Sequence, residues 1–261
     1  MILKDITPSI LTHNEEANIE RVISRLKWAS RIIVVDSFST DSTLDILRKH
    51  QNVEIYKKKF NSFHEQCEFG IEKVKTEWAF PIEADYIISD EFIKEISSMP
   101  AIPDENGFWV RRIFCIDGVP LRCSILPSQI VLFRKDKAVY YQDGHGHRPK
   151  IDGMTGMLKN PIYHDDRKPF KRWLANQEIY SSQEAKKITQ TAFKDLRISD
   201  KLRRTIIFMP FIMPIYILLL RGGIFEGKRA FYYAYLRTYY EIMLSSKIKN
   251  LTFNRPDAAR R

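Results

Sequence analysis

Two carboxylates lie one residue apart at the end of an apolar segment, WAFPIEAD (residues 78–85). We expect this segment to be a buried strand, on which Glu83 and Asp85, at positions i and i+2, face the same side. Two like charges aimed at one spot repel each other unless a cation, a proton or a cationic partner lies between them. The pair therefore indicates a binding or catalytic site.

Two further polar clusters, THNEE (12–16) and DSFSTDST (36–43), also follow predicted strands. Asp36 ends the apolar segment RIIVVD, and its carboxylate can accept hydrogen bonds from a nucleobase or a ribose. Asp41 is expected to cap the next helix, whose amino end would favour a diphosphate. Such clusters cap helices in many proteins, but three of them at successive strand ends favour a site.

The elements that position these clusters alternate regularly over the first hundred residues. Apolar and β-branched segments predict strands, and apolar residues at helical spacing predict helices. In chain order they are strand 6–11, helix 14–28, strand 31–36, helix 39–50, strand 53–58, helix 63–75 and strand 78–85. This βαβαβαβ order predicts a doubly wound α/β layer, which binds ligands beyond the carboxyl ends of its strands.

The pattern changes after residue 90. We expect a helix over 90–98, strands over 107–116 and 128–135, a Gly/His-rich loop over 140–153 and a helix over 169–188. The three cysteines match no metal spacing and are expected to be reduced thiols, as in the cytosol. The start of the chain lacks the apolar run of a signal peptide and is interpreted as a first strand.

The net charge of +10 is concentrated at one end of the chain. Residues 1–100 hold 13 Lys and Arg against 17 Asp and Glu, whereas residues 161–261 hold 20 against 9. A basic end predicts an anionic partner, either nucleic acid or the acidic face of a membrane. The cations alternate with Ile, Leu and Phe rather than lining a polar groove, so nucleic acid ranks last.

The basic end contains an uncharged apolar run over residues 206–220. It is shorter than the ~20 residues that a membrane-spanning helix needs, and it contains Pro210 and Pro214. Flanking cations and a Tyr-rich segment over 228–249 suit a membrane interface, so we expect interfacial attachment without spanning. The alternative is a pair of apolar core helices.

The segment ILTHNEEANIERVISRLKWASRIIVVDSFSTDSTLDIL (10–47) resembles the opening of family 2 inverting glycosyltransferases of the GT-A fold. It is most similar to the group that acts as β-1,4-glucosyltransferases on the lipopolysaccharide core. The likeness runs over residues 6–92, weakens across 93–160, and returns in LLLRGGIFEGKRAFYYAYLRTYYEI (218–242). It implies a GT-A mixed sheet with a helical, membrane-associating extension. It also implies domains at 1–165 (a nucleotide-binding half, 1–92, and an acceptor half, 93–165) and 166–261.

The resemblance also implies roles for individual residues. Glu83 and Asp85 take the place of the family's D-x-D, with Mg²⁺ or Mn²⁺ between them, and His164 matches a family histidine near the diphosphate or metal. The residues implied to bind the nucleotide sugar are Thr12, Asn14, Glu15, Asp36, Ser37, Asp41, Glu83, Ala84 and Asp85. A structural role for either family histidine in a loop stays open.

The catalytic base and the donor are less directly implied. His147 matches the family's His-Glu pair, but Arg148 replaces its Glu, so Asp143 is interpreted as the base that deprotonates the acceptor hydroxyl. Tyr86 stands where the group carries Glu. Arg112 could bind phosphate, although exposed arginines are more often solvated.

The resemblance implies an enzyme that moves a sugar from a nucleotide-diphosphate donor, a UDP-sugar, to a lipid-linked or lipopolysaccharide-core saccharide. It would lie in the cytoplasm, peripheral on the inner face of the cell membrane. The departures from the family pattern leave an alternative open. This is a non-catalytic protein that binds a nucleotide sugar or acts as a scaffold in the assembly of cell-envelope polysaccharide.

Overall fold

The computed structural model describes residues 3–143 and 146–253, and the side chains of residues 142–147 are not described. The chain forms two compact units. The first unit holds residues 1–120 and 126–168, and the second holds 121–125 and 169–261. The short segment 121–125 therefore belongs with the carboxyl-terminal part of the chain.

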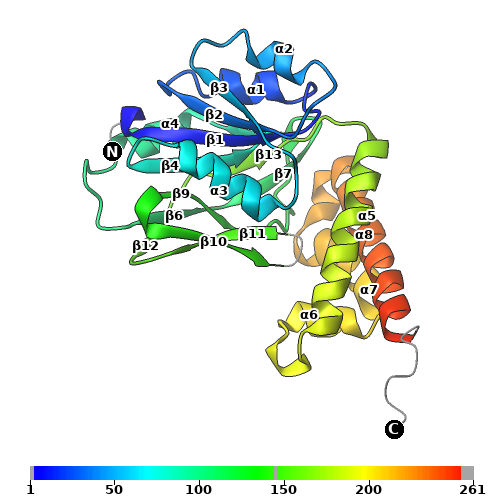
Figure 1. The fold of residues 1–261 in the computed structure, drawn as a ribbon. Helices are drawn as coiled ribbons and strands as arrows, with labels where there is room; N and C mark the ends of the chain where they lie inside the picture. The colour runs from blue at the N-terminus through cyan, green and yellow to red at the C-terminus, as the bar shows by residue number, and fades with distance from the viewer. Residues whose placement is uncertain (1–2, 144–145, 254–261) are drawn as a thin grey trace. The chain divides into compact units, whose positions relative to one another are not determined.

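A seven-stranded mixed sheet forms the centre of the first unit, in the order β12-β6-β9-β4-β1-β2-β3 (Figure 1). Strands β4, β1, β2 and β3 are parallel, and β9 runs antiparallel to both β4 and β6. The strands are β1 (Ile6–Thr12), β2 (Ile32–Asp36), β3 (Val53–Lys57), β4 (Trp78–Glu83), β6 (Gly107–Val110), β9 (Gln129–Arg134) and β12 (Thr155–Met157). The expected parallel α/β layer is present, extended by an antiparallel strand into the mixed sheet.

Helices cover both faces of this sheet, as its continuous apolar strands require. On β2, Ile32 and Val34 pack into one core, and Ile33 and Val35 pack into the other. The first core contains side chains of α1 (Ile19–Ser24), α2 (Thr43–Leu47) and α4 (Asp90–Ser98), and the second contains those of α3 (Phe63–Lys73). Helix α3 approaches β1 closely because Gly70 has no side chain: a Cβ there would lie 2.5 Å from Ser9 Oγ.

Two expectations about the middle of the chain are wrong. Residues 107–116 are not one strand, because the backbone leaves the main sheet after β6 and enters a second sheet as β7 (Arg112–Ile116). Residues 140–153 are not a loop, since most of them lie in an antiparallel hairpin of β10 (Ala138–Asp143) and β11 (Gly146–Ile151). Tyr140 anchors this hairpin by packing its ring edge-on against Phe133.

A smaller sheet completes the first unit and has the order β5-β13-β7-β8. Its strands are β5 (Tyr86–Ile88), β7 (Arg112–Ile116), β8 (Val119–Pro120) and β13 (Ile162–His164). Two short 3-10 turns, η1 (Leu3–Asp5) and η2 (Lys135–Lys137), flank strands of the main sheet. This smaller sheet matters for the site because β5 follows β4 after a single turn.

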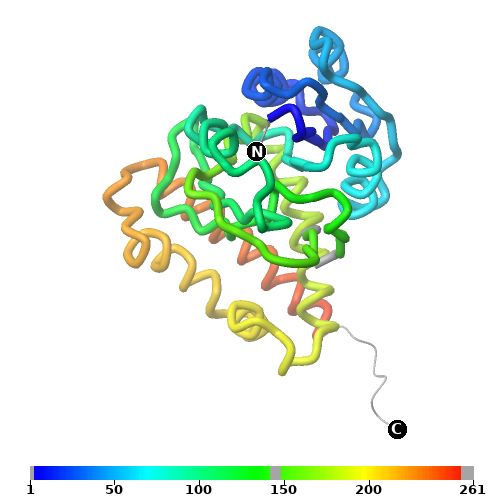
Figure 2. Tube along the Cα trace, turned by 90° about the vertical axis from the view of Figure 1, so that its left-hand side faces the viewer, coloured from blue at the N-terminus to red at the C-terminus, as the bar shows by residue number. Residues whose placement is uncertain are grey.

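The second unit is helical, and its two longest helices, α5 (Phe170–Gln190) and α8 (Lys228–Phe253), lie side by side (Figure 2). Ala185 and Ile188 of α5 pack against Tyr240 and Leu244 of α8. The elements between them are η3 (Phe193–Asp195), α6 (Ile198–Arg204), α7 (Phe208–Ile215), η4 (Tyr216–Leu220) and η5 (Gly223–Glu226). The expected helix over 169–188 is confirmed. Within residues 3–143 and 146–253, no helix is both long and apolar enough to cross a membrane.

All three cysteines, Cys67, Cys115 and Cys123, are buried free thiols, as expected. Cys123 lies in the short segment that belongs to the second unit. Its backbone amide and that of Arg122 each donate 2.7 Å hydrogen bonds to the carboxylate of Glu226. These two hydrogen bonds to one carboxylate explain why residues 121–125 associate with the helices of the second unit.

Candidate functional site

The carboxyl ends of three neighbouring parallel strands lie at one edge of the main sheet. In the register of β1 and β2, Thr12 pairs with Asp36, and in that of β1 and β4, Leu11 pairs with Glu83. The polar clusters after these strands therefore meet at one edge, as the alternation of strands and helices predicted.

Glu83 and Asp85 do come together, but not on one strand. Strand β4 ends at Glu83, and Ala84 and Asp85 form a turn into β5 of the smaller sheet. The expected same-face geometry of an unbroken strand is therefore wrong. A turn brings the two carboxylates near each other because the chain must change sheets at this point.

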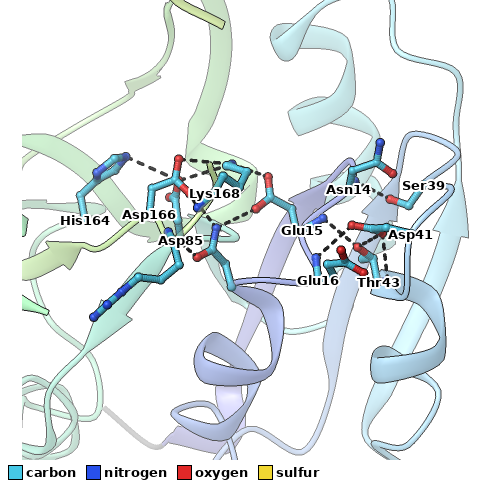
Figure 3. A network of polar contacts seen from close by, with 12 residues as sticks. Asn14, Glu15, Glu16, Ser39, Asp41, Thr43, Asp85, His164, Asp166 and Lys168 are labelled. Atoms are coloured by element: carbon cyan, nitrogen blue, oxygen red, sulfur yellow. Dashed lines mark hydrogen bonds and ion pairs between the residues drawn. The ribbon is translucent and has the colours of Figure 1, made fainter. Parts of the chain in front are cut away.

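His164 joins the two carboxylates through the pairing of β13 with β5. His164 pairs with Tyr86 across this ladder, and its ring stacks on Phe114 at 5.1 Å between centroids. Its Nε2 atom lies 3.6 Å from Oδ2 of Asp85 (Figure 3). One ligand atom from each of Glu83, Asp85 and His164 lies within 4.8 Å of the others, so the three could hold one metal ion.

The environment of Asp85 fits a divalent cation. Its side chain is buried, and among the described residues its Oδ1 atom has no hydrogen-bond partner. Burial raises the pKa of Asp85 to about 7; Glu83 adds to the rise, and His164 and Lys168 oppose it. A buried oxygen without a partner costs free energy, which a bound cation would offset. Carboxylate oxygens and an imidazole nitrogen form a donor set that Mn²⁺ and Mg²⁺ accept.

Lys168 lies in the middle of the acidic cluster, and the sequence analysis did not identify it. Its Nζ atom is 2.8 Å from Oε1 of Glu15, 3.6 Å from Oδ2 of Asp166 and 3.9 Å from Oδ2 of Asp85 (Figure 3). Burial alone lowers the pKa of Lys168, but these carboxylates together raise it above its ordinary value. Lys168 is therefore a charged ammonium at the edge of the candidate metal site.

Asn18 ties this cluster to the rest of the first unit. Its amide donates to Oε2 of Glu15 (3.1 Å) and to Oδ1 of Asp166 (2.8 Å). Its Oδ1 atom accepts from Arg21 and from the backbone amide of Arg167, each at 2.9 Å. Asn18 thereby holds the carboxylates of Glu15 and Asp166 in place beside Lys168.

Asp36 is completely buried at the end of β2. Its carboxylate accepts hydrogen bonds from Thr12 Oγ1 (3.0 Å), from the Ser39 amide (2.9 Å) and from Ser39 Oγ (2.5 Å). These bonds fix the loop that follows β2. The expected contact of Asp36 with a nucleoside stays a prediction, and its present partners are Thr12 and Ser39.

Hydrogen bonds join the loops after β1 and β2 (Figure 3). The backbone amide of Asn14 donates to Ser39 Oγ (2.9 Å), and the backbone amide of Glu15 donates to Thr43 Oγ1 (2.7 Å). Asn14 and Phe38 have positive φ angles of 57° and 60°, which cost free energy for residues with a Cβ. Strained backbone at two adjacent strand ends is typical of a functional loop.

The side chains of Asp41 and Glu16 lie at the amino end of α2. Asp41 accepts bonds from the amides of Thr43 (3.0 Å) and Glu16 (3.2 Å), and Glu16 accepts from the amide of Ser42 (3.1 Å). The amides of Ser42 and Thr43 at this end of the helix therefore donate to these two carboxylates. The expected contact of this helix end and of Asp41 with the nucleotide sugar stays a prediction.

Tyr86, which departs from the family pattern, holds Glu83. Its hydroxyl donates to Oε1 of Glu83 (2.9 Å) and accepts from Nη1 of Arg112 (2.6 Å). Arg112 is half-buried and also donates to the carbonyl of Pro127. Arg112 is therefore not an arginine that only solvent contacts. It binds the Tyr86 hydroxyl, and Tyr86 in turn orients Glu83.

The remaining predicted residues have the following positions. Ser37 Oγ accepts from the buried Gln66 of α3 (3.0 Å), and Ala84 is buried in the first core. Asp143 lies on β10 and His147 on β11, but the structure does not describe their side chains. The sequence signal that could have identified Lys168 is the polar run HDDRK (164–168), which begins at the last residue of β13.

Comparison of the sequence with known proteins shows the family to which the chain is similar. Residues 9–159 match the family described as Glycosyl transferase family 2. An uncharacterized glycosyltransferase of Rickettsia bellii is 24% identical over 221 residues, which cover 77% of this chain and 74% of that protein. The lipopolysaccharide core biosynthesis glycosyltransferase LpsC of Rhizobium meliloti is 26% identical over 113 residues, 41% of this chain and 42% of that protein.

Two solved structures are similar over nearly the whole chain. The mannosyltransferase PcManGT from Pyrobaculum calidifontis, in complex with GDP-Man and Mn²⁺, has a TM-score of 0.55 at 13% identity. The match covers 96% of this chain and 88% of PcManGT. S. aureus TarS 1–349, in complex with UDP-GlcNAc, has a TM-score of 0.50 at 13% identity, covering 97% and 93% of the two chains. At this identity the likeness concerns the fold.

Proposed function

The chain belongs to glycosyl transferase family 2, and we propose that it moves a sugar from a nucleotide-diphosphate donor, a UDP-sugar, to a saccharide acceptor with inversion at the anomeric carbon. Its central mixed sheet is like that of the GT-A glycosyltransferases. The observation that carries the proposal is the convergence of Glu83, Asp85 and His164 at the carboxyl edge of this sheet. Structural neighbours bind UDP-GlcNAc or GDP-Man and Mn²⁺, which supports this class of donor.

Asp85 and His164 are the residues that would hold a divalent cation, with Glu83 as the third candidate. The buried Oδ1 atom of Asp85, which has no partner among the described residues, supports this assignment. A cation bound there would offset the negative charge on the departing diphosphate. We infer Mg²⁺ or Mn²⁺ from the hard oxygen donors.

The chain's own residues would bind and orient the donor. Tyr86 holds Glu83, which would lie beside the diphosphate, and Thr12 and Ser39 orient Asp36 at the end of β2. Asp36 would recognise the nucleoside, after a local rearrangement that frees one of its oxygens. The loop after β1 with Asn14 and the loop after β2 would contact the rest of the nucleotide.

The transfer itself needs a base on the acceptor side. We propose Asp143, on β10, together with His147, on the paired strand β11. The Asp143 carboxylate would take the proton of the acceptor hydroxyl while its oxygen attacks the anomeric carbon and the nucleoside diphosphate leaves from the opposite side. Attack from that side inverts the configuration at this carbon.

We further propose that the acceptor is lipid-linked or part of the lipopolysaccharide core, and that the second unit binds an anionic membrane surface. Within the apolar run only Met209, Met213 and Ile217 are buried. Eight other residues of the run, with two that follow it, are exposed and define an apolar face: Ile207, Phe208, Phe211, Ile212, Ile215, Tyr216, Leu219, Leu220, Ile224 and Phe225. Helices that are apolar on all sides are normally covered on all sides.

Charge favours a membrane over a second copy of the chain as the cover of this apolar face. Residues 201–240 contain seven Lys and Arg and a single acidic residue, Glu226. The carboxylate of Glu226 is engaged by the amides of Arg122 and Cys123. In a dimer, the positive charges beside two such faces would repel each other, whereas anionic headgroups would attract them.

The test is a donor screen followed by a transfer assay. The full chain is mixed with Mn²⁺ and each of a panel of UDP- and GDP-sugars, and the melting temperature is recorded. Donors that raise it are then incubated with lipid-linked saccharides, and products are identified by mass spectrometry. Stabilisation with product formation supports a transferase, and stabilisation without turnover supports the alternative of a non-catalytic nucleotide-sugar-binding protein. No response to any nucleotide would contradict both.

A further inference from the structure

Four carboxylates and one ammonium meet around the candidate cation site. Glu83 ends β4, Asp85 comes from the turn after it, Glu15 from the loop after β1, and Asp166 from the segment after β13. Lys168 is within 4 Å of three of them, and its side chain is only 10% exposed. Such a cluster keeps one buried positive charge beside the residues assigned to the metal.

The three carboxylates near Lys168 fall into two groups. Glu15 and Asp166 are each bound through one oxygen to Asn18, and their other oxygens face Lys168 at 2.8 and 3.6 Å. Asp85 lies farther from the ammonium, at 3.9 Å, and keeps its Oδ1 atom unpartnered among the residues that the structure describes. Lys168 and Asn18 thus occupy two acids and leave the third available.

The position of Lys168 has opposite consequences for a cation and for a diphosphate. A divalent cation bound at Asp85 would lie a few ångströms from a fixed positive charge, and like charges in a poorly hydrated site repel strongly. A diphosphate bound to that cation would carry negative charge toward the same ammonium and would be attracted.

We propose, resting on the proposed function, that Lys168 couples the two ligands: it weakens the binding of the free divalent cation and strengthens the binding of the cation–nucleoside diphosphate complex. The site then takes up little metal until the donor arrives, and donor and metal bind together. This role concerns binding, so Lys168 is a positioning and binding residue rather than a proton carrier.

The substitution Lys168→Met tests the coupling because it keeps an unbranched side chain only one atom shorter and removes the charge. We expect the variant to bind Mn²⁺ alone about tenfold more tightly than the wild type, and Mn²⁺-saturated UDP or GDP about tenfold less tightly. Titration calorimetry measures both constants, and the electron paramagnetic resonance signal of free Mn²⁺ checks the first. Lys168→Arg keeps the charge and should retain the wild-type order of affinities.

Lys171→Met is the matched control, since Lys171 is an exposed lysine three residues farther along the chain. It should change neither constant. A purely structural role for Lys168 predicts that both affinities fall together in Lys168→Met, with a lower melting temperature, and this result would overturn the proposal.

The wild type alone provides a second measurement, which does not depend on the folding of any variant. Its affinity for Mn²⁺ should rise about tenfold when UDP or GDP is present, as reciprocal coupling requires. Equal Mn²⁺ affinities with and without a bound nucleotide would overturn the coupling and leave the proposed function standing. Failure of every nucleotide diphosphate to bind, with or without Mn²⁺, would overturn both.

Discussion

Nε2 of His164 lies 3.6 Å from Oδ2 of Asp85, because backbone pairing brings two distant segments together. The amide of Asp165 donates to the carbonyl of Asp85 (3.0 Å), and β13 pairs with β5 immediately beyond. The imidazole and the carboxylate are therefore held by main-chain hydrogen bonds rather than by flexible loops. Rigid support of this kind is what a metal or diphosphate site needs.

Asp85→Asn should abolish transfer while the protein stays folded. The amide keeps the shape of the carboxylate but lacks its charge, so a cation loses its most buried ligand. We expect at least a hundredfold loss of turnover, and loss of the rise in melting temperature caused by Mn²⁺ with nucleotide. Asp136→Asn, at an exposed aspartate in η2, is the control and should behave as the wild type. Full activity of Asp85→Asn would remove Asp85 from the metal site.

The stability of the cation-free protein should depend on pH through Asp85. Its pKa is about 7 in the folded protein against an ordinary value of 3.8, so the folded state holds this proton more firmly than the unfolded state. The group therefore favours folding at low pH, and this contribution is lost as the pH rises from about 4 through about 7. The shift corresponds to a penalty on the order of 4 kcal/mol at most above pH 7.

Asp85→Asn removes this titration and should melt at a higher temperature than the wild type at pH 8 in EDTA. The difference should narrow markedly at pH 5, where Asp85 is protonated in the folded state. Thermal denaturation of both proteins over this range measures the effect. A difference that stays constant from pH 5 to pH 8 would show that Asp85 is not the titrating group.

Tyr86→Phe should impair the site although Tyr86 is not one of the residues assigned to the metal. The hydroxyl of Tyr86 lies between Glu83 and the half-buried Arg112, so its removal leaves both groups without this bond. We expect a loss of about 1–3 kcal/mol in unfolding free energy and a severalfold loss of turnover. Urea denaturation and steady-state kinetics measure the two effects. Tyr163→Phe, in β13, is a control tyrosine of the same sheet. Wild-type turnover of Tyr86→Phe would show that Glu83 needs no such support.

Asp36→Ala should weaken donor binding and also loosen the loop after β2. The Asp36 carboxylate accepts three hydrogen bonds from Thr12 and Ser39, so its loss leaves buried donors unsatisfied, at a cost of about 1–3 kcal/mol. Thr12→Val breaks one of these bonds and keeps the Asp36 carboxylate. If Asp36 contacts the nucleoside, Asp36→Ala should lose more affinity for UDP by calorimetry than Thr12→Val. Equal losses would assign Asp36 a structural role only.

The sequence predicts the parallel half of the fold well, because each element there has a strong local pattern. The apolar segment ending at Asp36 and the polar clusters after β1, β2 and β4 are all visible without a structure. The two-residue spacing of Glu83 and Asp85 also identifies the acidic site, although a turn rather than a strand joins them.

The parts that could not be predicted depend on contacts between distant segments. Lys168 is one of many lysines in a basic region, and only the packing of its segment against Glu15 and Asp85 makes it part of the site. Arg112 resembles a solvated arginine until β7 brings it beside Tyr86. The hairpin β10–β11 has Gly and His residues near its turn, which hide the alternation that buries Tyr140.

The exposed apolar face of the second unit provides the last prediction: the full chain should bind anionic vesicles through this face. Phe211, Leu220 and Phe225 are 68%, 76% and 91% exposed, so glutamate at these positions should not disturb the packing of the helices. The triple variant Phe211→Glu, Leu220→Glu, Phe225→Glu should lose flotation with vesicles. Ile102→Glu, at an 81% exposed isoleucine of the first unit, should float as the wild type does.

Salt and lipid charge separate the two components of this attachment. Each cation near an acidic headgroup contributes roughly 1 kcal/mol, and this attraction is screened by salt, whereas insertion of apolar side chains is not. Flotation of the wild type should therefore be strongest with anionic vesicles at low salt and weaker, but still measurable, at high salt. Lys228→Glu should lower only the salt-sensitive part. If the triple variant still floats, the face does not bind lipid. If the wild type instead sediments as a dimer that the triple variant cannot form, a second copy covers the face.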